Sequence, residues 1–297
     1  MKENDAVLPG GKTGLEWTLR SVSVDLVQMR TLAALLFLLV MVPATARCQK
    51  VSAKQLVGVD NLIIVDDASG KVLASEGATQ PRQVASLQKL LTAMVIIEAG
   101  NLDKPVTVTA QDASCQPTKL PNSVGGTYTR RELLNAMLVL SANDAARALA
   151  RDNSGSEAAF GAKMTAIARR VGATNSVFKD SAGFTVSGQY STASDMVKIL
   201  RSAYSNPTIR QVDSIKFLTW RQANGKSTQL RNSNRLLHRH PNCRGGKVGY
   251  TAAAGHCAAV VWEEGGRRLF AVALGAKKEM FWLQLAVALK LYANGLL

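Results

Sequence analysis

A serine and a lysine three residues apart are the first candidates for chemistry in this sequence. Ser86 and Lys89 stand at the start of a run of good helix formers from Leu87 to Ala99, and Gly100 follows as a stop signal. On a helix, residues three apart share one face, with their Cβ atoms about 5–6 Å apart. A lysine with a lowered pKa can take the proton of a neighbouring serine and make it a nucleophile. The pair alone is more typical of an N-cap serine followed by a solvated lysine, so the catalytic interpretation depends on the rest of the sequence.

Two later segments carry side chains that would complete such a site. Ser141 and Asn143 interrupt a helical segment, and Lys247 belongs to a segment that we expect to be a strand. Each has an ordinary explanation by itself, namely a helix–helix turn for the first and a solvated strand lysine for the second. The three motifs together are far more specific, because their order, spacing and local structure all agree.

With these motifs the sequence resembles the penicillin-recognising serine D,D-peptidases, in particular the low-molecular-weight D-alanyl-D-alanine carboxypeptidases. That family carries Ser-x-x-Lys, Ser-x-Asn and Lys-Thr-Gly in this order. The resemblance covers essentially everything from Leu62 to Ala293. It implies an α+β fold, with an antiparallel sheet flanked by helices and a mostly helical subdomain, as in β-lactamases and D,D-peptidases. Further matching segments are Ala85-Ser86, Leu91-Thr92-Ala93-Met94, Asp180-Ser181-Ala182-Gly183, Ser191-Thr192-Ala193, Asn234-x-Leu236-Leu237 and Ala254-Gly255-His256.

The resemblance also implies catalytic roles for five residues. Ser86 is expected to attack the carbonyl of the penultimate D-alanine and form an acyl-enzyme, with Lys89 as its base. Bringing that lysine from a pKa near 10.4 to about 7 takes roughly 4 kcal/mol of differential destabilisation, from burial and from Lys247 as a second cation. Ser141 is expected to pass a proton to the departing D-alanine, and Asn143 to bind the substrate amide and the base.

The third motif departs from the family pattern at the position expected to hold the substrate carboxylate. It reads Lys247-Val248-Gly249, with valine in place of threonine. A hydrogen bond to a charged group is worth about 1.5–3 kcal/mol, so its loss is expected to cost roughly tenfold to a hundredfold in efficiency. Thr251, Arg235 and Arg244 are candidates for a replacement contact.

The expected substrate-binding residues belong to the predicted strand that carries the third motif, except for Arg235, which we expect in a loop. The backbone N–H groups of Ser86 and Tyr250 are expected to form the oxyanion hole. The resemblance requires neither a metal nor an organic cofactor, and the cysteines and histidines show no zinc spacing. The substrate-binding residues are Val248, Gly249, Tyr250, Thr251 and Arg235.

The resulting interpretation is a serine-type D-alanyl-D-alanine carboxypeptidase acting on peptidoglycan stem peptides, with β-lactams as covalent inhibitors. A D,D-endopeptidase that cleaves cross-links is an alternative, because Ala253–Cys257 also resembles that branch of the family. A peptidoglycan- or penicillin-binding protein with little turnover is a second alternative, suggested by Val248. A class A β-lactamase fits less well, since no counterpart of its deacylating glutamate loop is found between Ser141 and Lys247.

Composition agrees with a cell-envelope protein. The chain has 297 residues, 47% of them hydrophobic, with a formal charge of +15 and a pI near 9.9, which favours polyanionic partners. Only 5% of residues are aromatic and no nucleic-acid motif is found, so nucleic acid is not expected as a partner. Cys115, Cys243 and Cys257 could form a disulfide or remain free, and sequence does not decide between these.

The N-terminal region has the pattern of a secretory signal. Met29-Arg30 precedes the apolar run Thr31–Val42, and small residues follow in Pro43–Ala46. The run is shorter than the ~20 residues of a membrane span. We expect residues 1–46 to be an N-terminal extension and signal peptide, with Met29 as a candidate for the true start. Residues 47–297 are then one D,D-peptidase catalytic domain, periplasmic or secreted, with at most peripheral membrane association.

Several elements must position these side chains. A hairpin is expected at Leu62–Val65 and Lys71–Ala74, and a second at Lys216–Trp220 and Ser227–Leu230, turning at Asn224-Gly225. A capping box at Thr129–Glu132 predicts the start of the helix before Ser141. Further predicted helices are Ala145–Ala150, Ser156–Val171, Thr192–Ala203 and about Lys278–Ala293, and further predicted strands are Val106–Thr109, Lys247–Tyr250, His256–Trp262 and Arg268–Leu274.

Overall fold

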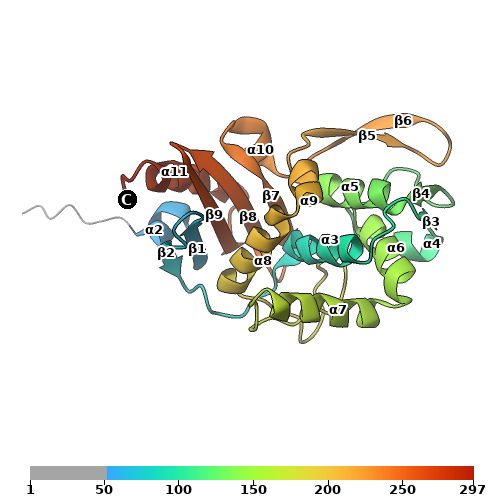
Figure 1. Ribbon diagram of the computed structural model, residues 1–297, viewed down its shortest axis with the longest axis horizontal. Coiled ribbons are helices and arrows are strands. Elements are labelled where there is room, and N and C mark those ends of the chain that lie inside the picture. The colour runs from blue at the N-terminus through green and yellow to red at the C-terminus, as the bar shows by residue number, and fades with distance from the viewer. Residues whose placement is uncertain (1–51) are drawn as a thin grey trace, which may run out of the picture. The chain divides into compact units, whose positions relative to one another are not determined.

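The computed structural model describes residues 52–297 (Figure 1). The chain divides by its internal contacts into Met1–Lys50 and Val51–Leu297. The predicted signal peptide and the candidate start at Met29 lie outside the described residues, and the single catalytic domain at 47–297 stays a prediction. Within residues 52–297, no helix is long and apolar enough to cross a membrane.

A five-stranded antiparallel sheet joins the two ends of the described chain. Its order is β2-β1-β9-β8-β7, so the N-terminal hairpin pairs with the C-terminal strands. The six residues of β1 are all buried, because both faces of the sheet are covered. Strand β7 has a neighbour on one side only and is the sheet edge on which the third motif lies. The strands are β1 Asn61–Asp66, β2 Val72–Glu76, β7 Cys243–Thr251, β8 Gly255–Glu264 and β9 Arg267–Ala276.

The two faces of the sheet pack against different helices. Leu62 and Ile64 of β1 belong to one apolar cluster with the C-terminal helix, whereas Ile63 and Val65 belong to a second cluster with the helical part. This alternation follows from the period of two in a strand. Helices α2 (Ala53–Val57), α10 (Arg235–Arg239) and α11 (Phe281–Ala293) pack on the first side, and α8 (Ala193–Ser205) packs on the other.

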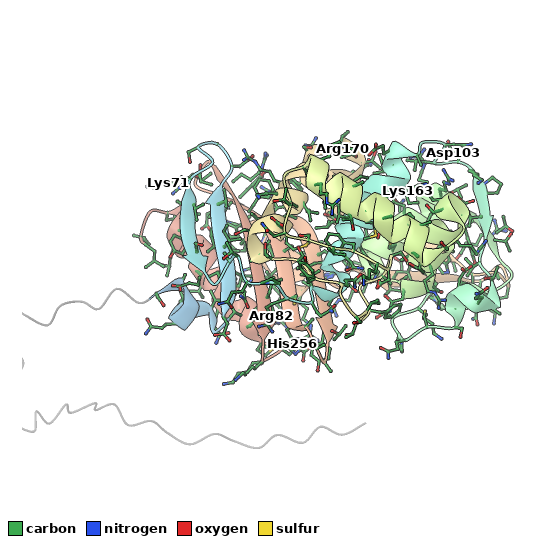
Figure 2. All side chains as sticks on the ribbon, turned by 90° about the horizontal axis from the view of Figure 1, so that it is seen from below. Lys71, Arg82, Asp103, Lys163, Arg170 and His256 are labelled. Carbon is green, nitrogen blue, oxygen red and sulfur yellow. The ribbon has the colours of Figure 1, made fainter. Side chains whose placement is uncertain are left out.

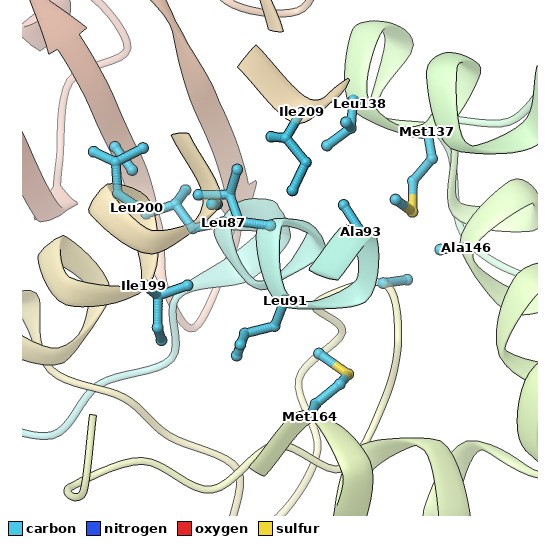
Figure 3. Close-up of a cluster of buried hydrophobic side chains, with 14 of the residues drawn as sticks. Leu87, Leu91, Ala93, Met137, Leu138, Ala146, Met164, Ile199, Leu200 and Ile209 are labelled. Atoms are coloured by element: carbon cyan, nitrogen blue, oxygen red, sulfur yellow. The ribbon is translucent and has the colours of Figure 1, made fainter. Parts of the chain in front are cut away.

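The helical part is built around α3 (Lys89–Glu98). Figure 3 shows Leu91 and Ala93 of this helix enclosed by side chains of the surrounding helices, including Met137, Met164 and Ile199. A helix that is apolar on nearly all sides has to be buried, and this one begins with Lys89, the lysine of the first motif. The surrounding helices are α5 Arg130–Leu140, α6 Asn143–Ser154, α7 Glu157–Arg170, α8 and α9 Pro207–Asp213.

The predicted fold class, an antiparallel sheet with helices and a mostly helical part, is confirmed. The capping box is present, with Thr129 accepting from the Glu132 backbone N–H and the glutamate accepting from the threonine N–H. The second hairpin is β5 Phe217–Arg221 and β6 Ser227–Arg231, which lies above α5 in Figure 1 and contributes Trp220 and Leu230 to the helical core. The predicted strand after α3 is β3 Pro105–Thr107. Short elements that periodicity did not reveal are α2, α9, α10, α4 (Ala110–Ala113) and β4 Thr127–Thr129, the partner of β3.

Charged side chains cover the outside of this unit. Lys71, Asp103, Lys163 and Arg170 all lie on the exposed periphery in Figure 2. The lysines of the first and third motifs do not follow this pattern, since Lys89 is 0% and Lys247 1% exposed. Burial of a charged lysine costs free energy unless the side chain is paired or neutral. These two buried lysines are therefore candidates for a functional site.

Candidate active site

The three motifs meet in a cleft where the edge strand β7 faces the helical part. The cleft has a volume of ≈ 500 Å³. Ser86, Ser141 and Asn143 line one wall, and Val248 to Thr251 line the other. The sequence therefore located the cleft from three segments more than fifty residues apart.

Ser86 lies in a 3-10 turn, η1 (Ala85–Gln88), directly before α3. Its side chain makes no capping hydrogen bond, so the alternative of an N-cap serine is wrong. In a 3-10 turn the side chains of residues three apart eclipse each other. Because of this geometry, Ser86 Oγ lies 2.8 Å from Lys89 Nζ.

Lys89 Nζ is surrounded by three oxygen atoms. It lies 2.7 Å from Asn143 Oδ1 and 2.6 Å from the Ala182 carbonyl, in addition to Ser86 Oγ. Burial lowers the pKa of Lys89 well below its usual range, and the positive charge of Lys247 lowers it further. A neutral amine has two N–H groups and one lone pair. It can donate to the amide and carbonyl oxygens while its lone pair accepts the serine proton.

A buried aspartate holds the loop that supplies one of these oxygens. Asp180 Oδ1 accepts hydrogen bonds from the backbone N–H groups of Ala182 (2.8 Å) and Gly183 (2.6 Å). Gln88 Nε2 donates to the same oxygen at 2.9 Å, which connects the loop to the turn that carries Ser86. In the sequence Asp180 belonged only to the family resemblance, and this hydrogen-bonding role was missed.

Two glycines allow the walls of the cleft to approach Ser86. Gly183 has φ +97°, and a Cβ there would lie 2.2 Å from the Ala85 carbonyl oxygen. A Cβ on Gly249 of β7 would lie 2.6 Å from the Ser86 backbone nitrogen. Side chains at these positions would displace the 3-10 turn, which gives Gly249 of the expected binding set a spacing role.

Ser141 and Asn143 stand where α5 ends and α6 begins. Ser141 has the left-handed φ of +70°, which costs a residue with a Cβ roughly 1–2 kcal/mol and is a form of strain that gathers at functional sites. Its hydroxyl makes no hydrogen bond with any described residue and lines the cleft. Asn143 donates from its backbone to the Thr118 carbonyl and from Nδ2 to the Gln116 carbonyl at 3.0 Å. One amide hydrogen of Asn143 therefore remains available to a ligand.

Lys247 lies in the middle of β7 and not at the start of a strand, because the strand begins at Cys243. Its Nζ donates to Ser233 Oγ at 3.1 Å and to the Val248 carbonyl at 3.3 Å. Burial lowers its pKa to about 8, whereas the negative charge of Asp213 acts in the opposite direction. Burial in turn raises the pKa of Asp213 to about 7.

Ser233 and Asp213 were not found by sequence reasoning. Both are common surface residue types in segments without a recognisable motif, and only the packing of α9 and the loop before α10 brings them to Lys247. The structure thus places a hydroxyl and a carboxylate beside the second lysine.

The expected substrate-binding residues all line the cleft. Tyr250 is 61% exposed, and its ring lies on His256 with centroids 4.4 Å apart. Thr251 Oγ1 accepts from the Ala254 backbone N–H at 3.0 Å. Val248 packs in part against the apolar cluster of the sheet face that α10 and α11 cover. Together these side chains line the β7 side of the cleft.

The two arginines considered as carboxylate ligands are both ion-paired. Arg235 lines the cleft and pairs with Glu279 at 2.5 Å. Arg244 pairs with Glu263 at 2.9 Å and does not line the cleft. A carboxylate entering the cleft would therefore have to compete with an existing partner of Arg235.

The described residues contain no group of three or more His, Cys, Asp or Glu side chains placed to hold a metal ion. Cys115, Cys243 and Cys257 are free thiols, which decides between the alternatives that the sequence left open. Burial raises the pKa of Cys243 and of Cys257 to about 11, so both remain protonated at neutral pH.

Comparison with known proteins gives a family model that matches most of the chain. The family model described as Peptidase S11, D-alanyl-D-alanine carboxypeptidase, matches residues 48–278. The D-alanyl-D-alanine carboxypeptidase DacB2 of Mycobacterium tuberculosis is 34% identical over 75% of this chain and 78% of its own length. DacF of Bacillus subtilis, also a D-alanyl-D-alanine carboxypeptidase, is 31% identical over 72% of this chain, which spans 56% of that protein.

A third relative and a solved structure complete the comparison. The D-alanyl-D-alanine endopeptidase of Escherichia coli is 33% identical over 66% of this chain and 64% of its own length. The crystal structure of a D-alanyl-D-alanine carboxypeptidase from Mycobacterium tuberculosis H37Rv superposes with a TM-score of 0.74 at 31% identity. That superposition covers 80% of this chain and 91% of the other.

Proposed function

The chain belongs to the D-alanyl-D-alanine carboxypeptidase family, and from this premise we propose that it is a serine-type hydrolase that removes the terminal D-alanine of peptidoglycan stem peptides. The observation that carries the proposal is the buried Lys89, whose Nζ lies 2.8 Å from Ser86 Oγ and whose pKa is lowered by burial. A neutral, buried amine can act as the base that takes the proton of a neighbouring hydroxyl and makes it a nucleophile.

Acylation begins with proton transfer from Ser86 to the neutral Lys89. The serine oxygen attacks the carbonyl carbon of the penultimate D-alanine, and the carbonyl oxygen becomes an oxyanion. The backbone N–H groups of Ser86 and Tyr250, two residues that line the cleft, are the proposed donors to this oxyanion. Loss of one such donor costs about 10²–10³ in rate. Asn143 supports the reaction by holding the amine and by offering its free amide hydrogen to the substrate.

Collapse of the tetrahedral intermediate breaks the C–N bond and releases D-alanine. Its nitrogen needs a proton, and the hydroxyl of Ser141 is the proposed path from the protonated Lys89. A positive charge on Lys247 would favour this step by keeping the nearby Lys89 from holding its proton tightly. Water then attacks the acyl-enzyme, gives its proton to the same amine and restores Ser86.

Covalent trapping by penicillin tests the proposal. Purified protein is incubated with benzylpenicillin, and its intact mass is measured. We expect one adduct on the wild type and none on Ser86→Ala, with Ser154→Ala as a matched control on an ordinary helix serine. Absence of an adduct on the wild type, or an equal adduct on Ser86→Ala, would contradict the assignment of the nucleophile.

A D,D-endopeptidase is the second candidate, and Val248 together with the Arg235–Glu279 pair favours it. The cleft offers a free terminal carboxylate neither a threonine hydroxyl in the third motif nor an unpaired arginine. A relative named D-alanyl-D-alanine endopeptidase matches the chain as well as several carboxypeptidases do. Free D-alanine from a pentapeptide indicates a carboxypeptidase, and monomers from cross-linked dimers indicate an endopeptidase.

A binding protein with little turnover is the third candidate. It predicts a penicillin adduct without release of either product. Two observations argue against a binding protein with little turnover. Lys89 keeps its hydrogen bonds to Ser86 and Asn143, and both Ser86 and Ser141 line the cleft. Product analysis by chromatography over a full day separates this candidate from the two hydrolases.

Export is part of the proposal. The signal-like segment at residues 29–46 and the +15 charge support a periplasmic or secreted protein held near anionic wall polymers. N-terminal sequencing of the protein recovered from the cell envelope tests this, with a new N-terminus close to residue 47 as the expected result.

A further inference from the structure

Asp213 is a buried carboxylate that the proposed reaction leaves unused. It is the last residue of α9 and is 2% exposed. Its Oδ2 atom has no hydrogen-bond partner among residues 52–297. A carboxylate is costly to bury without partners unless it becomes neutral, and burial raises the pKa of Asp213 to about 7. An apolar residue would fill this place at lower cost, so packing alone does not explain the carboxylate.

The geometry of β7 places Asp213 on the same side of the strand as the lysine of the third motif. Residues two apart on a strand share one face, so positions 245, 247 and 249 point to the same side. A Cβ on Gly245 would lie 2.8 Å from Cβ of Asp213, and a Cβ on Gly249 would lie 2.6 Å from the Ser86 backbone nitrogen. The side chain of Lys247 therefore lies on this face, between Asp213 and the turn that carries Ser86.

The start of β7 allows the end of α9 to come close. The register between β7 and β8 shifts between Cys243 and Gly245, and such an irregularity redirects the side chains of a strand. Gly245 has no side chain at the place where Asp213 packs, and Figure 1 shows α9 beside β7. The backbone N–H of Gly246 stabilises the charged form of Asp213. The carboxylate is thus held against the residues that directly precede Lys247.

Asp213 supplies a negative charge that acts on Lys247. The Nζ of Lys247 donates to Ser233 Oγ at 3.1 Å and to the Val248 carbonyl at 3.3 Å, and both of these acceptors are neutral. Burial lowers the pKa of Lys247 to about 8, and the charge of Asp213 opposes this effect. An opposite charge nearby favours the charged form of a lysine. Without Asp213, burial would act on Lys247 unopposed.

The other elements packed against β7 are β8, η1 and α10, and they bring few charges to Lys247. Ala259 of β8 is the residue opposite Lys247, and η1 has no charged side chain. Lys89, which follows η1, is the cation whose pKa Lys247 lowers. Cys257 of β8 is a protonated thiol at neutral pH. The other titratable side chains of β8 and α10 have contacts of their own, namely Arg235, His238, Arg239, His256, Glu263 and Glu264.

Lys247 is likewise the charge that acts on Asp213. Helices α5 and α8 also pack against α9. Their titratable side chains, and Arg210 of α9, take part in other ion pairs, hydrogen bonds or cation–π contacts; they are Arg130, Arg131 and Glu132 on α5 and Asp195, Lys198, Arg201 and Tyr204 on α8. Within the described chain, Asp213 and Lys247 therefore face each other as opposite charges.

We propose that Asp213 is a positioning residue for this site, whose carboxylate keeps Lys247 charged beside the cleft and thereby sets the upper pH limit of acylation. The inference rests on the proposed function, in which a positive Lys247 attracts the carboxylate of a penicillin and keeps Lys89 from holding its proton. Ser233, which accepts from Lys247, lines the cleft, whereas Asp213 does not. Asp213 therefore acts through Lys247 and not on the reacting atoms.

The sign of the pH effect follows from the two pKa values. Below about pH 7, Asp213 is protonated and neutral, and Lys247 is charged without its help. Above about pH 7, the ionised Asp213 stabilises the charged Lys247, which loses its proton above about pH 8. Asparagine has nearly the shape of the protonated aspartic acid. Asp213→Asn therefore reproduces the low-pH state of this position at every pH.

The rate of acylation by benzylpenicillin, followed by intact mass across the pH range, tests the inference. At about pH 6 we expect wild-type protein and Asp213→Asn to react at the same rate, because Asp213 is already neutral there. In the variant the alkaline limb is expected to move down by about one pH unit, the lower end of the range for a nearby opposite charge. Acylation at about pH 9 is then roughly tenfold slower than in the wild type.

Asp195→Asn is the matched control. It removes a buried carboxylate in the first turn of α8 that does not line the cleft. Its acylation rate relative to the wild type is expected to be the same at every pH. Asp213→Ser, which is neutral and smaller, is measured in the same way and is expected to show the same shift as Asp213→Asn. Melting temperatures show that each variant is folded.

Two results would overturn the inference. One is a rate ratio between wild type and Asp213→Asn that is the same at every pH, since a loss of packing slows the reaction without regard to pH. The other is an alkaline limb that stays in place in both Asp213 variants. Failure of the proposed function shows separately, as a missing penicillin adduct on the wild-type protein.

Discussion

Replacement of Val248 by threonine tests how the cleft treats a terminal carboxylate. The side chain lines the cleft, and neither arginine near the strand is free to replace the missing hydroxyl. A hydrogen bond from the introduced hydroxyl to a carboxylate is worth about 1.5–3 kcal/mol. We therefore expect kcat/KM for a pentapeptide with a free C-terminus to rise roughly tenfold to a hundredfold.

The substitution also has a cost that can be separated from this gain. Val248 packs in part against the apolar cluster, and a hydroxyl placed there loses apolar contact. Because the side chain is only half-buried, we expect a loss of about 1 kcal/mol or less in the free energy of unfolding. Urea unfolding measures this cost independently of activity.

Release of D-alanine is measured with a coupled oxidase. Cleavage of a cross-linked dimer is measured separately, with chromatography to detect the monomers. Val248→Ala is the control, since it removes packing without adding a hydroxyl and is expected to give no gain. An unchanged or lower kcat/KM in Val248→Thr would refute the reasoning and show that another group already holds the carboxylate. Glu279→Gln tests whether Arg235 is that group. The substitution removes the ion-pair partner of Arg235 and would then raise kcat/KM by itself.

Further predictions concern the two lysines and the turn that carries the nucleophile. The rate of penicillin acylation is expected to fall at low pH as Lys89, whose pKa is lowered, becomes protonated, and to fall again above about pH 8 as Lys247 loses its charge. In Lys247→Met the acid limb of this pH profile should move to higher pH, because the second cation no longer opposes protonation of Lys89; an unmoved acid limb would contradict their coupling. Gly183→Ala places a Cβ 2.2 Å from the Ala85 carbonyl oxygen at a φ of +97°. We expect it to cost about 1–3 kcal/mol in urea unfolding and to slow acylation strongly, whereas Gly100→Ala, which has a similar positive φ and no atom within 4 Å, is expected to cost stability without slowing acylation.

Folding of the sheet shows what could and could not be read from the chain. The hairpins and the last three strands were predictable, because alternation and turn residues are local signals. The pairing of β1 with β9 joins residues about two hundred positions apart, and no local signal specifies it. The five short helices and strands that were missed have too few residues to show a period, and tertiary contacts stabilise them.

The sequence by itself determined which chemistry this protein carries. Ser86, Lys89, Ser141, Asn143 and Lys247 are recognisable by type, order and setting, since a nucleophile and its base must be close and the local helix geometry makes them so. The replacement of threonine by Val248 was equally visible.

Only the tertiary structure decided the state of these groups. Burial by helices from distant segments lowers the pKa of Lys89, and packing of α9 brings Asp213 to Lys247. Asp180 reaches the turn of the nucleophile through a loop almost a hundred residues away. The pKa of a side chain is shifted by desolvation and by nearby charges, and the whole fold provides both. It therefore cannot be predicted from two residues three positions apart.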